Sequence, residues 1–432
     1  MNSTSSWFSQ TFGFVRGNIL VLTISGSLGM FSRSMVFPYV PLYVLALGGD
    51  PEQVGIVYAL GPLGGLLMFP IAGYLADHMN RPRLIALAGY FSAVMLLINA
   101  VAPTWEWVAA ARLLQGLAVF HFPASSAIIA DSLPPEHRGR GMATMAAMAG
   151  TVALFAPYLA GTTLDAWGVE RGMRILYVAM AAAYAGGATI NLLFLKETRQ
   201  VSPDRVRMDN LAQTFRGVYA DIVPLLRGFS PALKAMSVIV TLCFVCNGLA
   251  GPFWVVYVTT EVGLSSSQWG LILLVEAGLR NLSTIPAGFL VDHFGRRRFI
   301  LMVLLFSWVI PLLLLAGSFA QVLVLRCVIG IISAFFSPAM GALMADIVPS
   351  ENRGRVMAAI GRGTVMVGGA TGGIGGPGVG FLTTLPLIIG SACGGILYAI
   401  SPSIPFLFVL GAMVVAFALA VGFLHEPKNA EL

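Results

Sequence analysis

Twelve long apolar runs follow one another along the chain, and they restrict the possible folds more than any other feature. A helix needs about 20 apolar residues to cross the hydrocarbon core of a bilayer, and all its backbone groups are then bonded internally. Only 10% of the 432 residues are charged, against about a quarter in a soluble domain, so a polar surface cannot cover the apolar side chains. The runs also lack the alternation of apolar and polar residues that marks a membrane β-barrel.

We therefore predict an all-α polytopic membrane protein with twelve transmembrane helices. The predicted spans lie near residues 18–47, 53–75, 84–102, 105–130, 142–163, 174–195, 232–259, 267–290, 299–317, 321–347, 379–400 and 404–424.

The distribution of Lys and Arg predicts how the spans are oriented. With the N-terminus placed in the cytoplasm, 19 of the 25 basic residues fall on the cytoplasmic side, and only Arg171 and Arg174 fall outside. This bias is typical of the positive-inside rule. We expect a multi-pass protein of the plasma membrane with both termini cytoplasmic. The net charge of +6 is then a topology signal and gives no reason to expect a nucleic-acid partner.

Two connections are longer than the others. Residues 196–231 form a polar linker in which Leu211, Phe215, Val218 and Ile222 recur at helical spacing. This segment is either a helix lying on the membrane surface or one packed on the bundle. The glycine-rich stretch 367–380 is expected to form a flexible cytoplasmic loop, because its glycines do not specify a lipid-exposed helix. It lacks the G-x-x-x-x-G-K-S/T pattern, so we do not expect it to bind phosphate.

The two sides of the linker repeat each other. "GYLADHMNRPR" at 73–83 returns as "GFLVDHFGRRR" at 288–298, and "ADSLPPEHRGR" at 130–140 returns as "ADIVPSENRGR" at 345–355, both at an offset of 215. An even number of spans separates the copies, so both face the same side of the membrane. We predict an N-terminal six-helix half over 1–195 and a C-terminal six-helix half over 232–432.

This pattern resembles the major facilitator superfamily of secondary transporters. The family's motif between spans two and three, G-x-L-A-D-R-x-G-R-K/R, fits the second copy at Gly288, Leu290, Asp292, Gly295, Arg296 and Arg297. The first copy keeps Gly73, Leu75, Asp77 and Arg81 but departs at Asn80 and Pro82. A second family motif, R-x-x-Q-G, stands in span four as Arg112, Gln115 and Gly116.

The resemblance implies a cytoplasmic latch, by which we mean two sets of charges that hold the outward-open state. The first set is Asp77, Arg81 and Asp131, and the second is Asp292, Arg296 and Asp346. The arginines are expected to pair with the carboxylates that close spans four and ten. The alternative is that these charges only anchor the loops at the lipid headgroups.

Ionisable residues inside spans are costly and point to function. In the family, spans one, four, seven and ten line a central cavity, and the intramembrane polar residues on them are Arg33, Arg112, Asn247 and Arg326. Gln115 shares a helix face with Arg112. Glu276 is the one acidic residue in mid-span, and Arg280 lies four residues further on. We expect these seven residues to contact substrate and Glu276 to carry a proton. Alternatively, Arg112 and Arg326 are structural and bond to neighbouring spans.

Three further features are weaker. His121 is expected to be packed in the bundle or to lie at its lipid edge, and the alternative is a proton relay. All four cysteines lie inside apolar runs, and the pair Cys243 and Cys246 is expected to be two small buried residues and not a metal or redox site. The family's export motif on span five is degraded: Gly141 and Gly150 have its first spacing, but its end reads Ala156-Pro157 and Ala160-Gly161.

The sequence thus predicts a monomeric secondary transporter that works by alternating access, with a small-molecule substrate, protons and the lipid bilayer as its partners. Proton-coupled export of small organic or amphiphilic molecules is the first hypothesis. Proton-linked uptake of an organic anion, suggested by the excess of intramembrane arginine, is the second. A membrane sensor or an enzyme is disfavoured because no ATP-binding motif, nucleophile triad or metal cluster stands in the sequence, and no cofactor is expected.

Overall fold

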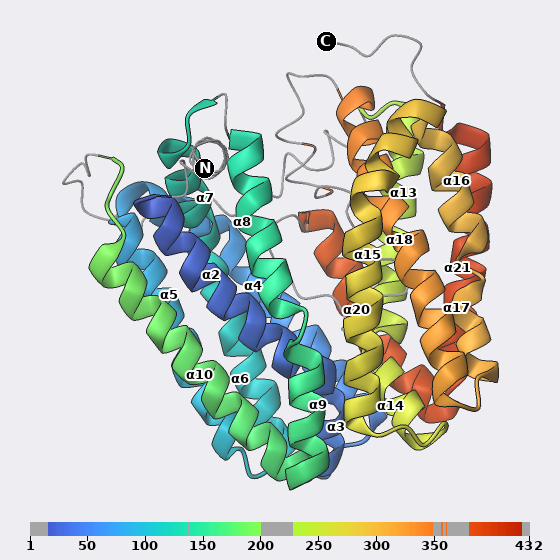
Figure 1. The fold of residues 1–432 in the computed structure, drawn as a ribbon, viewed down its shortest axis with the longest axis horizontal. Helices are drawn as coiled ribbons and strands as arrows, with labels where there is room; N and C mark the ends of the chain where they lie inside the picture. Colours follow the sequence, from blue (N-terminus) through green and yellow to red (C-terminus); the bar gives the residue numbers. More distant parts are fainter. Residues whose placement is uncertain are drawn as a thin grey trace, which may run out of the picture.

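The computed structural model describes residues 16–135, 138–199, 228–348, 356, 360 and 380–425. In these residues the chain forms helices only, and the helices lie side by side in one bundle (Figure 1). Most of the linker, with its predicted helix around Leu211 to Ile222, and the glycine-rich stretch up to 379 fall outside the described residues.

The first six predicted spans correspond to eleven helical segments. They are α2 (Asn18–Val36), η1 (Phe37–Tyr39), α3 (Val40–Ala46), α4 (Pro51–His78), α5 (Arg81–Val101), α6 (Trp105–Leu117), η2 (Ala118–Phe120), α7 (His121–Ser132), α8 (Arg138–Ala153), α9 (Ala156–Trp167) and α10 (Val169–Phe194), with η1 and η2 as single 3₁₀ turns.

The last six spans correspond to α13 (Pro231–Ala250), α14 (Phe253–Thr260), α15 (Ser266–Phe294), α16 (Arg296–Phe306), α17 (Val309–Leu312), η5 (Leu313–Leu315), α18 (Phe319–Ile347), α20 (Phe381–Ile400) and α21 (Ile404–Phe423). We call the helices up to α10 the N-terminal half and those from α13 the C-terminal half.

Several spans that the sequence predicts as continuous are broken in the structure. Proline lies at or just after most breaks: Pro38 in η1, Pro157 at the start of α9, Pro252 before α14 and Pro311 in α17. Proline has no N–H to donate and its ring clashes with the preceding turn, so the helix bends or restarts there. The apolar runs gave no sign of these breaks because proline is itself apolar enough to leave a run uninterrupted.

Eleven of the described helices are long and apolar enough to cross a membrane. α15 has 29 residues and completes the predicted twelve by length and place in the chain, although its charged residues make it more polar. One stripe of α15 is nonetheless highly exposed and apolar, with Leu282, Ile285 and Phe289 each more than 70% exposed. Such a stripe fits contact with lipid.

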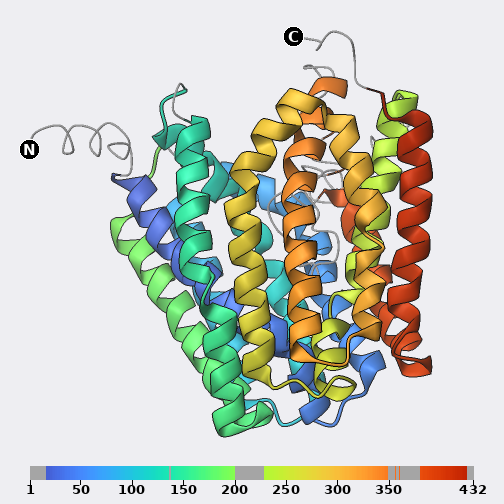
Figure 2. The same cartoon turned by 45° about the vertical axis from the view of Figure 1, so that its right-hand side comes forward.

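The two halves meet at one end of the bundle only. We call one end of the bundle the terminal face: α4, α7 and α15 end there, and α5, α8 and α16 begin there. We call the opposite end the distal face, and it holds the short connections that follow Ala46, Val101 and Thr260. The contacts between halves join α4 to α20, α9 to α15 and α3 to α14. Figures 1 and 2 show the halves close together at the distal face, at the bottom of both views, and apart towards the terminal face.

Candidate functional site

The intramembrane charges of the C-terminal half form one compact ion cluster. Glu276 of α15 accepts a hydrogen bond from Nε of Arg326 of α18 at 2.8 Å, and Nη2 of Arg326 lies 2.6 Å from the same oxygen. Nη1 of Arg280 lies 3.9 Å from the other carboxylate oxygen of Glu276. The side chains of Glu276 and Arg326 are 2% and 0% exposed, so this is a fully buried pair flanked by a second, partly exposed cation.

Two features of the sequence place this pair. A Cβ on Gly330 would lie only 2.9 Å from the carbonyl oxygen of Glu276, so glycine is what allows α18 to pack against α15 here. The guanidinium of Arg326 also lies 5.8 Å and 5.6 Å from the ring centres of Trp254 and Trp269, which are fully buried. Aromatic faces attract a cation and exclude water from it. A pair buried in this way is strongly destabilised by loss of one partner.

The N-terminal half has a different arrangement around Arg112 of α6. Its guanidinium lies 4.5 Å from the ring centre of Phe37 and 5.6 Å from that of Tyr58. Arg33 of α2 lies 5.3 Å from the same Phe37 ring, so two cations share one aromatic side chain. Arg112 is 4% exposed, and its buried Nε and Nη2 have no hydrogen-bond partner among the described residues. Neither arginine forms an ion pair with any residue that the structure describes.

The seven predicted substrate-contacting residues therefore fall into separate groups. Glu276, Arg280 and Arg326 form the C-terminal cluster, and Arg33 and Arg112 form the N-terminal one. Gln115 lies half-buried one turn beyond Arg112 on α6. Asn247, near the end of α13, has a buried amide oxygen without a partner among the described residues. His121 is packed within the bundle, with Nδ1 2.6 Å from the carbonyl oxygen of Ala118.

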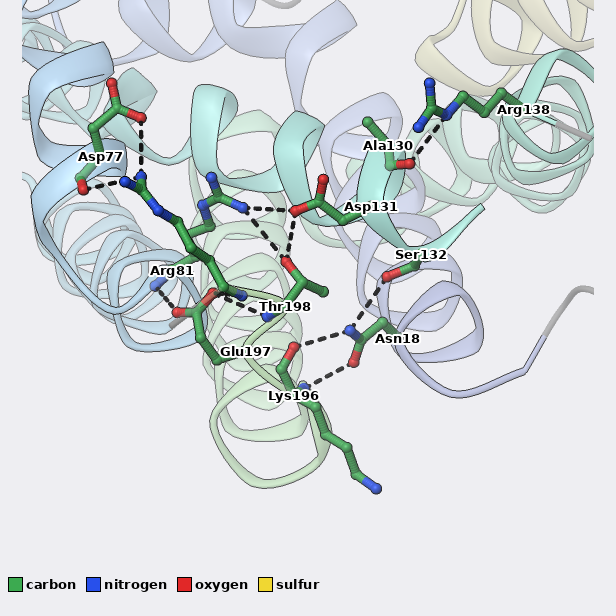
Figure 3. A network of polar contacts seen from close by, with 11 residues as sticks. Asn18, Asp77, Arg81, Ala130, Asp131, Ser132, Arg138, Lys196, Glu197 and Thr198 are labelled. Carbon is green, nitrogen blue, oxygen red and sulfur yellow. Dashed lines mark hydrogen bonds and ion pairs between the residues drawn. The ribbon is translucent and has the colours of Figure 1, made fainter. Parts of the chain in front are cut away.

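At the terminal face of the N-terminal half, Arg81 bonds to Asp131 at 2.9 Å, and the Thr198 hydroxyl donates to the same carboxylate at 2.8 Å (Figure 3). Asp77 does not join this pair. It lies 3.8 Å from Arg199, with both side chains at least half exposed. The predicted set is thus divided: Arg81 pairs with Asp131, and Asp77 pairs with Arg199 instead. Both pairs involve the segment after α10, through Thr198 and Arg199.

Sequence reasoning overlooked that segment. Glu197 accepts a hydrogen bond from the backbone N–H of Arg81 at 2.7 Å, at the first turn of α5. A carboxylate at a helix N-terminus satisfies a free donor and stabilises the helix dipole. Asn18 holds the same segment through the backbone of Lys196, donating to its carbonyl at 2.9 Å and accepting from its N–H at 2.8 Å. The run of polar residues from 196 was visible in the sequence, but nothing in it indicated which helix it would contact.

In the C-terminal half, Arg296 forms an ion pair with Asp346, and Arg297 donates to the carbonyl oxygen of Val421 at 2.8 Å. Arg296 therefore ties the start of α16 to the end of α18, and Arg297 ties it to α21. Asp292 lies exposed on the last turn of α15. Each latch arginine thus pairs with the predicted carboxylate at the end of the fourth span of its half, Arg81 with Asp131 and Arg296 with Asp346. That these contacts hold one conformation of the protein stays a prediction.

The distal face holds a polar contact between the halves that the sequence did not point to. Asp165 at the end of α9 accepts hydrogen bonds from the backbone N–H groups of Ser266 at 2.9 Å and Ser267 at 3.0 Å, at the first turn of α15. The fully buried hydroxyl of Tyr39 lies between the two helices, 2.7 Å from the carbonyl oxygen of Pro157 and 3.0 Å from that of Ser266. We call these contacts the distal seam.

Glycine brings the backbones together along this seam. A Cβ on Gly161 would lie 2.3 Å from the carbonyl oxygen of Ser266, and one on Gly270 would lie 2.4 Å from that of Pro157. A Cβ on Gly395 of α20 would lie 2.6 Å from the carbonyl oxygen of Pro51 of α4. These distances leave no room for a side chain. The degraded motif on span five therefore contributes its second half, around Pro157 and Gly161, to the contact between halves.

No group of three metal-ligating side chains stands close enough to hold a metal ion in the part of the chain that the structure describes. Cys243 and Cys246 are buried free thiols on α13. The chemistry that the described residues offer is ion pairing of Glu276 with Arg280 and Arg326, and attraction of electron-rich groups by the arginines of the N-terminal half.

Comparison with known proteins agrees with this arrangement. The sequence matches the Major Facilitator Superfamily profile over residues 22–233 and 236–431. It is 26% identical to a "Multi-drug resistance efflux pump PmrA homolog" of Lactococcus lactis, over 76% of this chain and 79% of the relative. It is also 26% identical to "Multidrug resistance protein MdtG" of Serratia proteamaculans, over 78% and 81%. The fold resembles the inward-facing structure of a bacterial homologue of the lysosomal transporter Spinster, with a TM-score of 0.68, 17% identity and coverage of 95% and 98%.

Proposed function

The chain belongs to the Major Facilitator Superfamily, and from this premise we propose that it exports small organic or amphiphilic molecules in exchange for protons. It is a multi-pass integral membrane protein, and its membership of a transporter family implies a small-molecule substrate. We propose that the protein lies in the plasma membrane with its terminal face towards the cytoplasm. We also propose that it is a monomer whose two halves are residues 1–195 and 232–432. The bias of Lys and Arg supports this orientation. The structure then represents an inward-open state, closed at the distal seam.

The observation that carries the proposal is the position of Glu276. It is a carboxylate inside a span, bonded to Arg326 on the neighbouring helix and near Arg280 on its own. A proton on Glu276 would cancel its attraction to both arginines. α15 also forms the distal seam, where Gly270 contacts the backbone of Pro157 in the other half. Protonation of Glu276 would therefore change the contacts of α15, the same helix that closes the distal face.

The names of the relatives support export of amphiphiles. Both curated relatives reported above are named for multidrug resistance, and one of them as an efflux pump. In an exchanger of this type the substrate and the proton bind alternately. We propose that the inward-open state takes up substrate from the cytoplasm or inner leaflet, and that the outward-open state returns Glu276 to the protonated form after substrate release.

Proteoliposomes with an imposed pH gradient test this proposal. A panel of cationic, neutral and anionic fluorescent amphiphiles is added, and solute movement and lumenal pH are followed together. We expect at least one solute to move against its gradient while protons move the opposite way, and Glu276→Gln to abolish accumulation but keep downhill exchange. Accumulation by Glu276→Gln at the wild-type rate would contradict the role of Glu276. Movement of solute and protons in the same direction would favour uptake.

Proton-linked uptake of an organic anion remains the second candidate. The observation that favours it is the pair of arginines without a carboxylate partner around Phe37. The same liposome experiment separates the two candidates, because uptake requires that solute and protons move together, whereas export by exchange requires that they move in opposite directions.

A further inference from the structure

The two halves differ at one pair of equivalent positions, Gly61 and Glu276. Arg326 stands at an offset of 214 from Arg112, and Gly330 stands at the same offset from Gly116. In the C-terminal half, the backbone of Glu276 is the nearest neighbour of a Cβ on Gly330, at 2.9 Å. In the N-terminal half, the backbone of Gly61 is the nearest neighbour of a Cβ on Gly116, at 2.2 Å. Gly61 of α4 is therefore the structural equivalent of Glu276 of α15.

The consequence is that Arg112 has no carboxylate at the position from which Glu276 pairs with its counterpart Arg326. A Cβ built on Gly61 would have the Arg112 guanidinium as its nearest surroundings, with Nη2, Cζ and Nε at 3.7, 3.8 and 3.9 Å. These are ordinary contact distances, so the position has room for the start of a side chain that points at Arg112. Nε and Nη2 of Arg112 are buried and without a partner among the described residues.

An uncompensated buried cation is costly, and the neighbours of Arg112 reduce this cost only in part. The rings of Phe37 and Tyr58 provide cation–π contacts, whereas Arg33 adds a second positive charge over the same Phe37 ring. The hydroxyl of Tyr58 is already donated to the carbonyl oxygen of Phe37 at 2.8 Å. What the site lacks is one anionic acceptor with two oxygens, which is the group that a guanidinium binds best.

We propose that Nε and Nη2 of Arg112, beside Gly61, bind the carboxylate of an aromatic or amphiphilic organic anion, which supplies the anionic partner that the Glu276 side chain supplies in the other half. The two donors of Arg112 bind the carboxylate, the Phe37 and Tyr58 rings contact the apolar part, and half-buried Arg33 adds the attraction that draws an anion in. This inference rests on the proposed transport function, whether the direction is export or uptake, and specifies its substrate class.

Binding of an aromatic carboxylate can be tested with benzoate and benzamide as probes, using the full-length protein in detergent. The two molecules have the same shape, but only benzoate carries a charge. We expect benzoate to raise the melting temperature saturably and benzamide to have no such effect. Arg112→Gln should weaken benzoate binding at least tenfold. An equal response to both probes, or no response to benzoate, would overturn the proposal.

The matched pair Gly61→Glu and Gly61→Gln tests the position itself. Gly61→Glu places a carboxylate opposite Arg112, so we expect a higher melting temperature without ligand and at least tenfold weaker benzoate binding. Gly61→Gln adds the same bulk without the charge and should not raise the melting temperature as Gly61→Glu does. Benzoate binding that is unchanged in Gly61→Glu would refute the site.

These measurements need no flux, so they separate this inference from the proposed function. Charge-selective binding at Arg112 in a protein that shows no proton-driven transport would contradict only the proposed function. Proton-driven transport in a protein whose Gly61→Glu variant still binds benzoate normally would contradict only the carboxylate site.

Discussion

Asp165 accepts a hydrogen bond from the backbone N–H of Ser266 at 2.9 Å, and this bond joins the last turn of α9 in one half to the first turn of α15 in the other. The second oxygen of Asp165 accepts from Ser267, so a single carboxylate satisfies two of the free donors at the start of α15. In an alternating-access cycle the distal face must open, and α15 then loses this cap. The bond therefore favours the state in which the distal face is closed.

Asp165→Asn should shift the protein towards the state that is open at the distal face. Asparagine keeps one acceptor but loses the charge, and because Asp165 is exposed we expect an effect of about 1 kcal/mol, or roughly fivefold in the ratio of the two states. Distances between spin labels placed at the distal ends of α9 and α15 would measure the ratio. Thr162→Ala is the matched control, because the Thr162 hydroxyl donates within its own helix, to the carbonyl oxygen of Leu159, and has no other partner among the described residues.

Gly395→Val should prevent closure of the distal face. Its Cβ would lie 2.6 Å from the carbonyl oxygen of Pro51 and 2.9 Å from the Cα of Glu52, and neither backbone atom can move without separating α20 from α4. We expect transport in proteoliposomes to fall more than tenfold while the protein still expresses and inserts. Gly411→Val is the control, because a Cβ there meets nothing within 4 Å. If both valine variants transport equally well, close approach at Gly395 is not needed for the cycle.

Arg326→Gln should destabilise the protein, because it leaves Glu276 at 2% exposure with Arg280, at 3.9 Å, as its remaining charged partner. Loss of one member of a buried pair costs about 3 kcal/mol or more. The double variant Glu276→Gln with Arg326→Gln removes both charges, and we expect it to melt at a higher temperature than either single variant. Arg83→Gln, which changes an exposed arginine, should melt like the wild type.

Melting can be followed with a thiol-reactive dye, because Cys243 and Cys246 are buried in α13 and become accessible on unfolding. The exposed Cys393 is replaced by serine in every variant to remove its signal. A double variant less stable than both single variants would mean that the two side chains contribute mainly through packing and not through their charges.

The sequence was sufficient for the parts of the fold that depend on hydrophobicity and repetition. Run length predicted the twelve helices, and the offset of 215 predicted that Arg81 and Arg296 occupy equivalent places, each paired with a carboxylate 50 residues further on. Helical spacing also predicted that Arg280 lies beside Glu276. These relationships are local or symmetric, so a single sequence contains them.

Contacts between helices that are distant in the sequence could not be predicted in the same way. Nothing in the sequence brings Arg326 to Glu276, 50 residues away, or Asp165 to Ser266 in the other half, because both contacts depend on which glycines allow two backbones to approach. The repeat did contain one unused signal: aligning Gly61 with Glu276 would have shown that the carboxylate is present in one half only.

Asp77→Asn should favour the state that is open at the terminal face, if Asp77 belongs to the latch. In the present state Asp77 has only an exposed partner, Arg199 at 3.8 Å, and exposed ion pairs contribute about 0–1 kcal/mol, so its loss costs little here. Any contact that Asp77 makes when the terminal face closes would be lost as well. Crosslinking between cysteines placed at the terminal ends of α4 and α20 should therefore become less efficient.

Asp131→Asn provides the contrast, because Asp131 accepts bonds from both Arg81 and Thr198 in the present state. Loss of the Asp131 charge should destabilise the terminal face of the N-terminal half by about 1 kcal/mol in the present, open state. We therefore expect Asp131→Asn to lower the melting temperature and Asp77→Asn to leave it unchanged. Equal crosslinking in Asp77→Asn and the wild type would show that Asp77 only anchors its loop near the headgroups. The latch would then consist of the pairs Arg81–Asp131 and Arg296–Asp346 alone.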